Sequence, residues 1–133
     1  MENDNTQMPD VACKVLYIVD NPANLRLVEA MLKKYKDITL MSANNGQFGL
    51  EMAQQYLPDI ILLDIQLPDM DGYKVLNALH ERTATSCIPV VAISADAMPL
   101  DVEKGLKSGF REYLTKPVRI EEVVRAIRTN TSC

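Results

Sequence analysis

Four polar side chains in this sequence directly follow apolar runs, and their chemistry suits a divalent cation and a phosphoryl group. Asp20 ends the run VLYIV, and Asp64 ends the run IILL. Ser94 ends VVAI, and Lys116 follows the shorter run EYLT. Carboxylate oxygens bind Mg²⁺, whereas an ammonium group and a hydroxyl suit phosphoryl oxygens. Each residue alone has a simpler explanation, as a helix cap, a turn former or solvated surface, so the prediction requires all four to meet.

The elements that must bring these residues together alternate regularly along the chain. Apolar runs predict five strands, at residues 14–19, 38–43, 59–64, 88–94 and 111–117. Helical patterns follow them, at residues 22–36, 45–56, 73–82, 99–109 and 119–130. This alternation predicts an α/β fold, with a doubly wound, five-stranded parallel sheet and helices on both faces. Because ligands bind at the carboxyl ends of the strands in such a sheet, we expect the four polar residues to share one edge.

Apolar residues at helical spacing predict which face of each helix packs on the sheet. The predicted inward residues are Leu25, Val28, Met31 and Leu32 in the first helix, Phe48, Met52 and Ala53 in the second, Val75, Leu76 and Leu79 in the third, and Ile120, Val123, Val124 and Ile127 in the last. Gly109 is expected to end the fourth helix, since glycine readily adopts the left-handed conformation found at helix ends.

Length and composition indicate one domain of ordinary globular type. We expect a flexible tail at residues 1–12, a single domain at 13–129 and a second tail at 130–133. Hydrophobic residues make up 47% of the chain, and the net charge is −4 without a block of like charges, which argues against direct nucleic-acid binding. The first ten residues lack the pattern of a signal peptide, and no apolar run has the length of a membrane span. The three cysteines are expected to be free thiols of a cytoplasmic protein that does not insert into membranes.

Four separated stretches resemble the receiver domain of two-component response regulators. They are LYIVDNPANLRLVE, DIILLDIQLPDMDGYKVL, PVVAISADA and EYLTKP, which occur in the family's order between about Lys14 and Arg128. The stretches DNPAN and SADAMP are similar to those of receivers in hybrid sensor kinases. The resemblance implies a flavodoxin-like (βα)5 fold with strand order 2-1-3-4-5. It also implies a module of signal transduction and phosphorelay.

The resemblance implies that Asp64 is the phosphoacceptor. A histidine kinase or a phosphotransfer protein would supply the phosphoryl group from a phosphohistidine, so the chain would modify itself and would not be an enzyme acting on a separate substrate. The implied cofactor is Mg²⁺, held by Asp20, Asp64 and the backbone carbonyl of Gln66.

The resemblance also implies a phosphate-binding set and a switch. Lys116, the Ser94 hydroxyl and the Ala95 amide would bind the phosphoryl oxygens, and the bond between Lys116 and Pro117 would be cis. Ser94 and Tyr113 would form the switch pair that alters the face made by the fourth helix, the fifth strand and the last helix. Through that face the chain could also form a homodimer.

Gln66 and Asp96 each lie two residues after a site residue, where the family tunes the lifetime of the phosphoryl group.

Val19 departs from the family pattern, which usually has two adjacent acids at the end of the first strand. Pro22 and Asn24 indicate that Asp20 fills the second position, so that the acid that would act on magnesium through water is missing. The alternative alignment, with Asp20 in the first position and Asn21 in the second, would be more damaging. The loss of such a carboxylate changes metal affinity about 10- to 100-fold, so transfer should be slowed and not abolished. The alternative is a degenerate receiver that binds partners without phosphorylation. A phosphatase of the haloacid dehalogenase type would need a second Asp where Gln66 stands.

Overall fold

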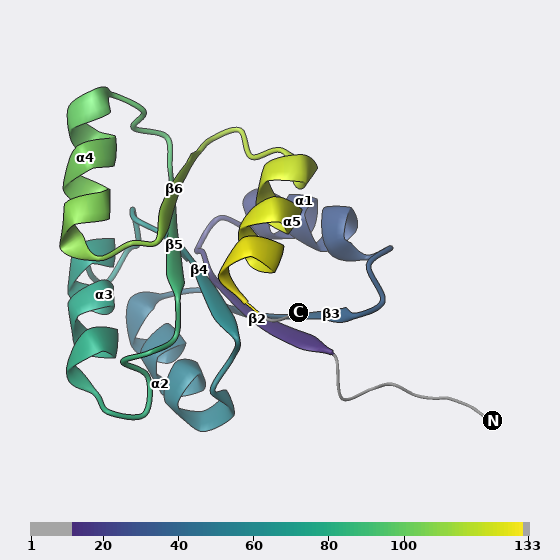
Figure 1. Ribbon diagram of the computed structural model, residues 1–133, viewed down its shortest axis with the longest axis horizontal. Helices are drawn as coiled ribbons and strands as arrows, with labels where there is room; N and C mark the ends of the chain where they lie inside the picture. Colours follow the sequence, from purple (N-terminus) through teal and green to yellow (C-terminus); the bar gives the residue numbers. More distant parts are fainter. Residues whose placement is uncertain (1–11, 132–133) are drawn as a thin grey trace.

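The computed structural model describes residues 12–131, which form five strands alternating with five helices (Figure 1). The strands are β2 (Cys13–Ile18), β3 (Ile38–Ala43), β4 (Ile60–Asp64), β5 (Val90–Ser94) and β6 (Glu112–Thr115). The helices are α1 (Pro22–Leu32), α2 (Gly46–Tyr56), α3 (Gly72–Glu81), α4 (Pro99–Ser108) and α5 (Ile120–Asn130). Residues 1–11 of the predicted N-terminal tail and residues 132–133 lie outside the described residues.

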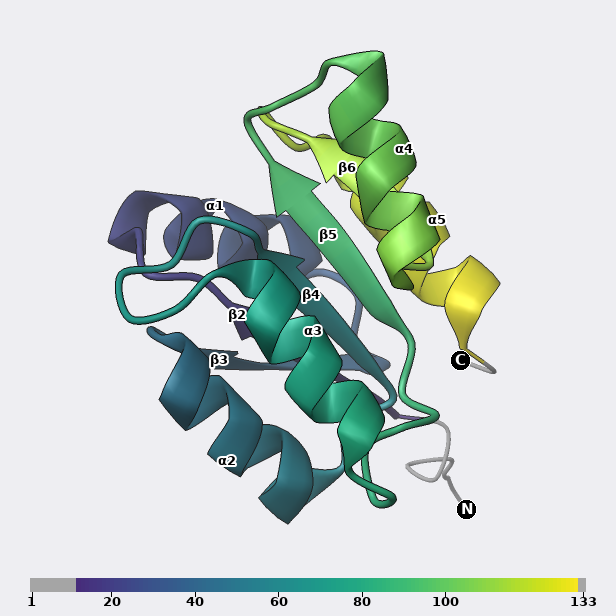
Figure 2. The same cartoon turned by 90° about the vertical axis from the view of Figure 1, so that its left-hand side faces the viewer.

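All five strands are parallel, and their order in the sheet is β3-β2-β4-β5-β6. In chain order this is 2-1-3-4-5, so the predicted flavodoxin-like fold is confirmed. Helices α1 and α5 cover one face, while α2, α3 and α4 cover the other (Figures 1 and 2). Asp64 pairs with Ile93, and Ser94 pairs with Thr115, so the carboxyl ends of β4, β5 and β6 lie side by side.

The sheet separates two apolar cores, and β2 contributes to both. Val15, Tyr17 and the following Val19 face the core beneath α1 and α5, whereas Leu16 and Ile18 face the core beneath α2 and α3. This division follows from the period of two along a strand, and it explains why the run lacks polar alternation. The strand that leads to Asp20 is therefore buried on both faces.

Two helices differ in detail from the predictions. Helix α1 ends at Leu32 and not at residue 36, because the chain turns there and the Tyr35 amide donates to the Leu32 carbonyl at 3.0 Å. In α2 the predicted inward residue Phe48 is 46% exposed. Gly49 faces the sheet instead, and a Cβ at this position would lie 2.5 Å from the Ile18 side chain. The helix packs so closely that glycine contributes to its inner face beside Leu50 and Ala53, which hydrophobicity alone did not indicate. Gly109, in contrast, has φ 118° and ends α4 as predicted.

The prediction of three free thiols is wrong for Cys13. Cys87 is free and exposed, but Cys13 is disulfide-bonded.

The last helix runs to Asn130, so it includes the first residue that we assigned to the C-terminal tail. The Asn130 side-chain amide donates to Glu112 Oε2 at 2.8 Å, which fixes the end of α5 against β6. Within residues 12–131, none of the helices combines the length and the apolar character that crossing a bilayer requires.

Candidate functional site

Asp64, the last residue of β4, is only 1% exposed, and both of its carboxylate oxygens have partners. Lys116 Nζ donates to Oδ2 at 2.7 Å, and the Gln66 backbone amide donates to Oδ1 at 3.0 Å. A buried carboxylate is tolerated when a cation and hydrogen-bond donors compensate for its lost hydration. The fold therefore brings together the predicted acceptor and the predicted lysine, which are 52 residues apart in sequence.

Lys116 lies just after the short strand β6, and its backbone is anchored to the neighbouring strand. Its amide donates to the Ser94 carbonyl at 2.9 Å, and its peptide bond with Pro117 is cis, as expected. Its side chain is 24% exposed, in contrast to the buried carboxylate it contacts. The ammonium group is thus held at the carboxylate while keeping access to solvent, where a phosphoryl oxygen would arrive.

Asp20 lies on the same edge of the sheet, just beyond β2. Ile18 pairs with Leu63 in register, so the chain leaves β2 beside the end of β4. Asp20 is exposed, and no hydrogen bond from another group to its carboxylate is present among residues 12–131. The next residue, Asn21, caps α1 by accepting from the Ala23 amide at 2.8 Å. Asn21 therefore begins the helix, and the Asp20 side chain remains available to a cation.

Magnesium would find a small set of hard oxygen ligands here. The described part of the chain has no group of three His, Cys, Asp or Glu side chains able to hold a metal ion. Two carboxylates, Asp20 and Asp64, with the Gln66 carbonyl suit Mg²⁺, which keeps several waters and needs few protein ligands. Val19, at 2% exposure in the apolar core, adds no oxygen. The residues fit Mg²⁺, with one carboxylate fewer than the family pattern.

Asp96 joins three of the predicted residues in a way the sequence did not indicate. Its backbone amide donates to Ser94 Oγ at 3.0 Å, and its backbone carbonyl accepts from the Tyr113 hydroxyl at 2.8 Å. Its carboxylate accepts from Gln66 Nε2 at 3.3 Å. The loop after β5, where Ala95 is also exposed, is thus connected both to the acceptor loop and to the aromatic residue of β6. The sequence placed Asp96 only by its distance from Ser94.

Tyr113 is half-buried between β6 and α4. A Cβ at Gly105 of α4 would lie 2.6 Å from Tyr113 Cδ2, so glycine is what lets the ring pack there. The ring position therefore depends on α4 as well as on the hydrogen bond to Asp96.

The loop after Asp64 is fixed by a residue that our sequence analysis did not single out. Asp69 accepts from the Gly46 amide at 2.7 Å and from the Gln47 amide at 2.9 Å, and so caps the N-terminus of α2. These hydrogen bonds lower the pKa of Asp69 below its usual value. The Gly72 amide closes the loop by donating to the Ile65 carbonyl at 2.9 Å. The turn residues in LPDMDG were visible in the sequence, but the partner helix was not.

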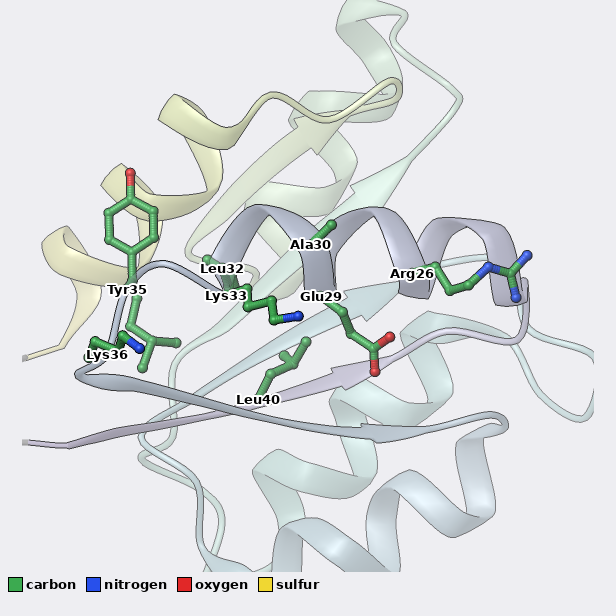
Figure 3. A pocket seen from close by; sticks show the side chains of 9 residues that line it. Arg26, Glu29, Ala30, Leu32, Lys33, Tyr35, Lys36 and Leu40 are labelled. Carbon is green, nitrogen blue, oxygen red and sulfur yellow. The ribbon is translucent and has the colours of Figure 1, made fainter.

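A larger hollow of about 670 Å³ lies elsewhere, between α1 and the edge strand β3 (Figure 3). Arg26 and Glu29 of α1, Lys33 just after this helix and Leu40 of β3 border it (Figure 3). None of the predicted site residues lines this hollow. Its size alone therefore does not make it the candidate site, since the predicted residues lie around Asp64.

Comparison with known proteins agrees with the fold. A family model described as "Response regulator receiver domain" matches residues 15–128. The histidine-protein kinase BarA of Escherichia coli (strain K12) is 36% identical over 124 residues, which are 90% of this chain and 13% of BarA. The chain thus spans about an eighth of the length of that relative.

Two solved structures share the fold at 27–28% identity. The receiver domain of sensor histidine kinase PA1611 from Pseudomonas aeruginosa PAO1, with a magnesium ion coordinated in its active-site cleft, is 28% identical with a TM-score of 0.83, covering 92% of this chain and 99% of that one. The receiver domain of Ssk1 from Saccharomyces cerevisiae, co-crystallised with the histidine phosphotransfer protein Ypd1, is 27% identical with a TM-score of 0.80, covering 91% and 90%.

Proposed function

The chain belongs to the response regulator receiver family, and from this premise we propose that Asp64 accepts a phosphoryl group from a phosphohistidine. The observation that carries the proposal is the contact of 2.7 Å between Lys116 Nζ and the buried carboxylate of Asp64 at the end of β4. A histidine kinase or a phosphotransfer protein is the donor. The Ssk1 receiver, which was co-crystallised with such a phosphotransfer protein, supports this choice of partner.

The transfer is a displacement at phosphorus. An oxygen of Asp64 attacks, an O–P bond forms, the N–P bond of the phosphohistidine breaks, and its electron pair stays on the imidazole nitrogen. Negative charge then moves from the carboxylate to the phosphoryl oxygens. Because Lys116 is partly exposed, its ammonium can follow that charge outward while the Gln66 amide holds the remaining carboxyl oxygen. Mg²⁺, when held by Asp20, Asp64 and the Gln66 carbonyl, supplies positive charge beside the phosphoryl oxygens.

The hydrogen bonds of Asp96 supply the route from the site to the surface. In the proposal the Ser94 hydroxyl leaves the Asp96 amide and donates to a phosphoryl oxygen, with the Ala95 amide beside it. The loop then shifts, which alters the bond from the Tyr113 hydroxyl and the position of its ring against α4. The face of α4, β6 and α5 carries the output, either to a partner or in a homodimer. Met98 and Leu100 at the start of this face are 68% and 77% exposed.

The test is covalent labelling with a small phosphodonor and Mg²⁺, read by intact-mass spectrometry. The wild type should gain one phosphoryl group, and Asp64→Asn should gain none. Asp59→Asn is the matched control, because Asp59 is an exposed aspartate just before the same strand and should leave labelling unchanged. Labelling of the Asp64→Asn variant to the wild-type extent would overturn the assignment.

A second candidate function rests on Val19. This residue is buried in the apolar core where the family pattern has an acid, so the chain would act as a receiver that binds partners without phosphorylation. Titration with Mg²⁺ and beryllofluoride, a phosphoryl mimic, separates the two functions through the fluorescence of Tyr113 or backbone amide shifts. A response at millimolar Mg²⁺ supports phosphorylation, and no response supports the second function.

A further inference from the structure

A small cavity of about 50 Å³ lies beside Lys116, on the side of the sheet that α1 and α5 cover. Its lining includes three polar side chains, those of Tyr17, Asn24 and Lys116. The remaining lining comes from apolar residues and from the connection between β6 and α5. A cavity needs roughly 10–15 Å³ to hold one water, and the water needs two to four polar partners. The cavity therefore has room for ordered water, and three of the residues that line it carry polar groups.

Tyr17 contributes the most deeply buried polar group of this cavity. It is 1% exposed in β2, and within the described residues its hydroxyl has no protein hydrogen-bond partner. A buried hydroxyl without a partner costs free energy, so water is expected to satisfy it. Burial, and to a lesser extent the negative charge of Asp64, raise the pKa of Tyr17.

The position of Tyr17 in β2 relates it to the missing acid. Tyr17 and Val19 face the same core, two residues apart along one face of the chain. Val19 offers no polar atom to the site, and Val15 on the other side of Tyr17 is also apolar. On this face of β2, Tyr17 is thus the residue that carries a side-chain oxygen.

We propose that the Tyr17 hydroxyl, through water held in this cavity, orients the ammonium group of Lys116 toward Asp64 and the incoming phosphoryl group. Tyr17 is then a positioning residue, because it acts through Lys116 and does not touch the reacting atoms. Lys116 has three N–H donors, of which one reaches Asp64 Oδ2, so a second remains for this water. The inference rests on the proposed function, since it concerns the same transfer to Asp64.

Tyr17→Phe tests the proposal, because it removes one oxygen and leaves the ring in the core. We expect the ¹⁵N NMR signal of Lys116 Nζ to shift and its protons to exchange faster with solvent. We also expect the rate of labelling by a small phosphodonor to fall about 3- to 10-fold, as for the loss of one hydrogen bond. Tyr35→Phe is the matched control, since Tyr35 packs partly buried against the same apolar core but does not line this cavity. Thermal unfolding of both variants checks that the fold is retained.

The two measurements separate the ways in which the proposal can fail. If the Lys116 Nζ signal shifts no more in Tyr17→Phe than in Tyr35→Phe, the proposal is overturned at any labelling rate, because Tyr17 would not act through Lys116. A shifted signal with an unchanged rate would overturn it as well, because the orientation would not matter for transfer. If the wild type is not labelled at all, the proposed function fails, and the Nζ signal still decides whether Tyr17 orients Lys116.

Discussion

The two sides of the candidate site are built differently. The acceptor side consists of Asp64, the Gln66 amide and Lys116, and its carboxylate is buried with a partner on each oxygen. The metal side consists of Val19 and Asp20, of which the first is apolar and buried and the second is exposed and has no hydrogen-bond partner among residues 12–131. Under the proposed function, this contrast predicts that the nucleophile is held in place without a metal, whereas the metal side depends on an ion and its waters.

Under the proposed function, this difference predicts that magnesium affinity limits transfer, and not the arrangement of the nucleophile. A carboxylate already paired at 2.7 Å needs no rearrangement to receive a phosphoryl group beyond the outward movement of Lys116. A site with two carboxylates and one carbonyl binds Mg²⁺ more weakly than one with an additional acid. Changes on the two sides should therefore alter different quantities, namely the maximal rate on the acceptor side and the magnesium requirement on the metal side.

Lys116→Ala should have the largest effect. It removes the positive charge that follows the phosphoryl group and leaves the Asp64 carboxylate buried without its cation. We expect the labelling rate at saturating Mg²⁺ to fall about 100- to 1,000-fold, the usual result of deleting one electrostatic group at a transition state. Lys107→Ala is the control, since that lysine is 75% exposed and pairs only with Glu103 on the surface of α4. If a higher Mg²⁺ concentration restored the labelling rate of Lys116→Ala, the division into an acceptor side and a metal side would be contradicted.

Val19→Asp should improve the metal side. The change restores an acid at a position adjacent to Asp20, and it keeps nearly the same side-chain volume at a buried site. We expect the Mg²⁺ concentration for half-maximal labelling to fall about 10- to 100-fold, with little change in the maximal rate. Isothermal titration with Mg²⁺ measures the affinity directly. If the variant is stably folded and binds Mg²⁺ no better than the wild type, position 19 is not what limits the metal side.

Asp69→Ala should have a smaller effect, through the loop that carries Gln66. The substitution removes the two hydrogen bonds that Asp69 accepts at the N-terminus of α2, while the N-cap Asn45 remains, and it should lower the free energy of unfolding by about 0.5–2 kcal/mol at pH 7. Because the pKa of Asp69 is lowered on folding, its contribution is fully present above the usual value of 3.8 and is lost as pH falls through the folded value. Urea unfolding at several pH values should show that the free energies of unfolding of the wild type and of Asp69→Ala become equal only at a pH below the folded pKa of Asp69. A difference between their free energies of unfolding that grows as the pH falls would contradict the stabilising role of Asp69.

The sequence predicted well the features that depend on the periodicity of apolar residues. It predicted poorly the features that depend on contacts between elements distant in the chain. Strand order, the residues at the strand ends and the meeting of Asp64 with Lys116 followed from alternating runs and from the receiver resemblance. The outward position of Phe48 did not, because the space at Gly49 depends on Ile18 in another element. The capping by Asp69 was also missed, since it joins residues more than 20 positions apart.

Tyr17 illustrates the same limit within a single strand. In the sequence it is one apolar-looking residue of VLYIV, and its ring is indeed buried in the core. Only the packing of α1 and of the connection after β6 shows that a small polar cavity lies there. The chemical identity of a residue is visible in a sequence, but the cavity beside it is made by elements that come later in the chain.

Reductive trapping of the phosphoryl group tests the central claim most directly. Borohydride converts an aspartyl phosphate to homoserine, and peptide mass spectrometry then locates the modified residue. After labelling with a phosphodonor and Mg²⁺, we predict homoserine at position 64 and at no other aspartate. Homoserine at another position, or labelled protein in which residue 64 is still aspartate, would contradict the assignment of Asp64 as the acceptor.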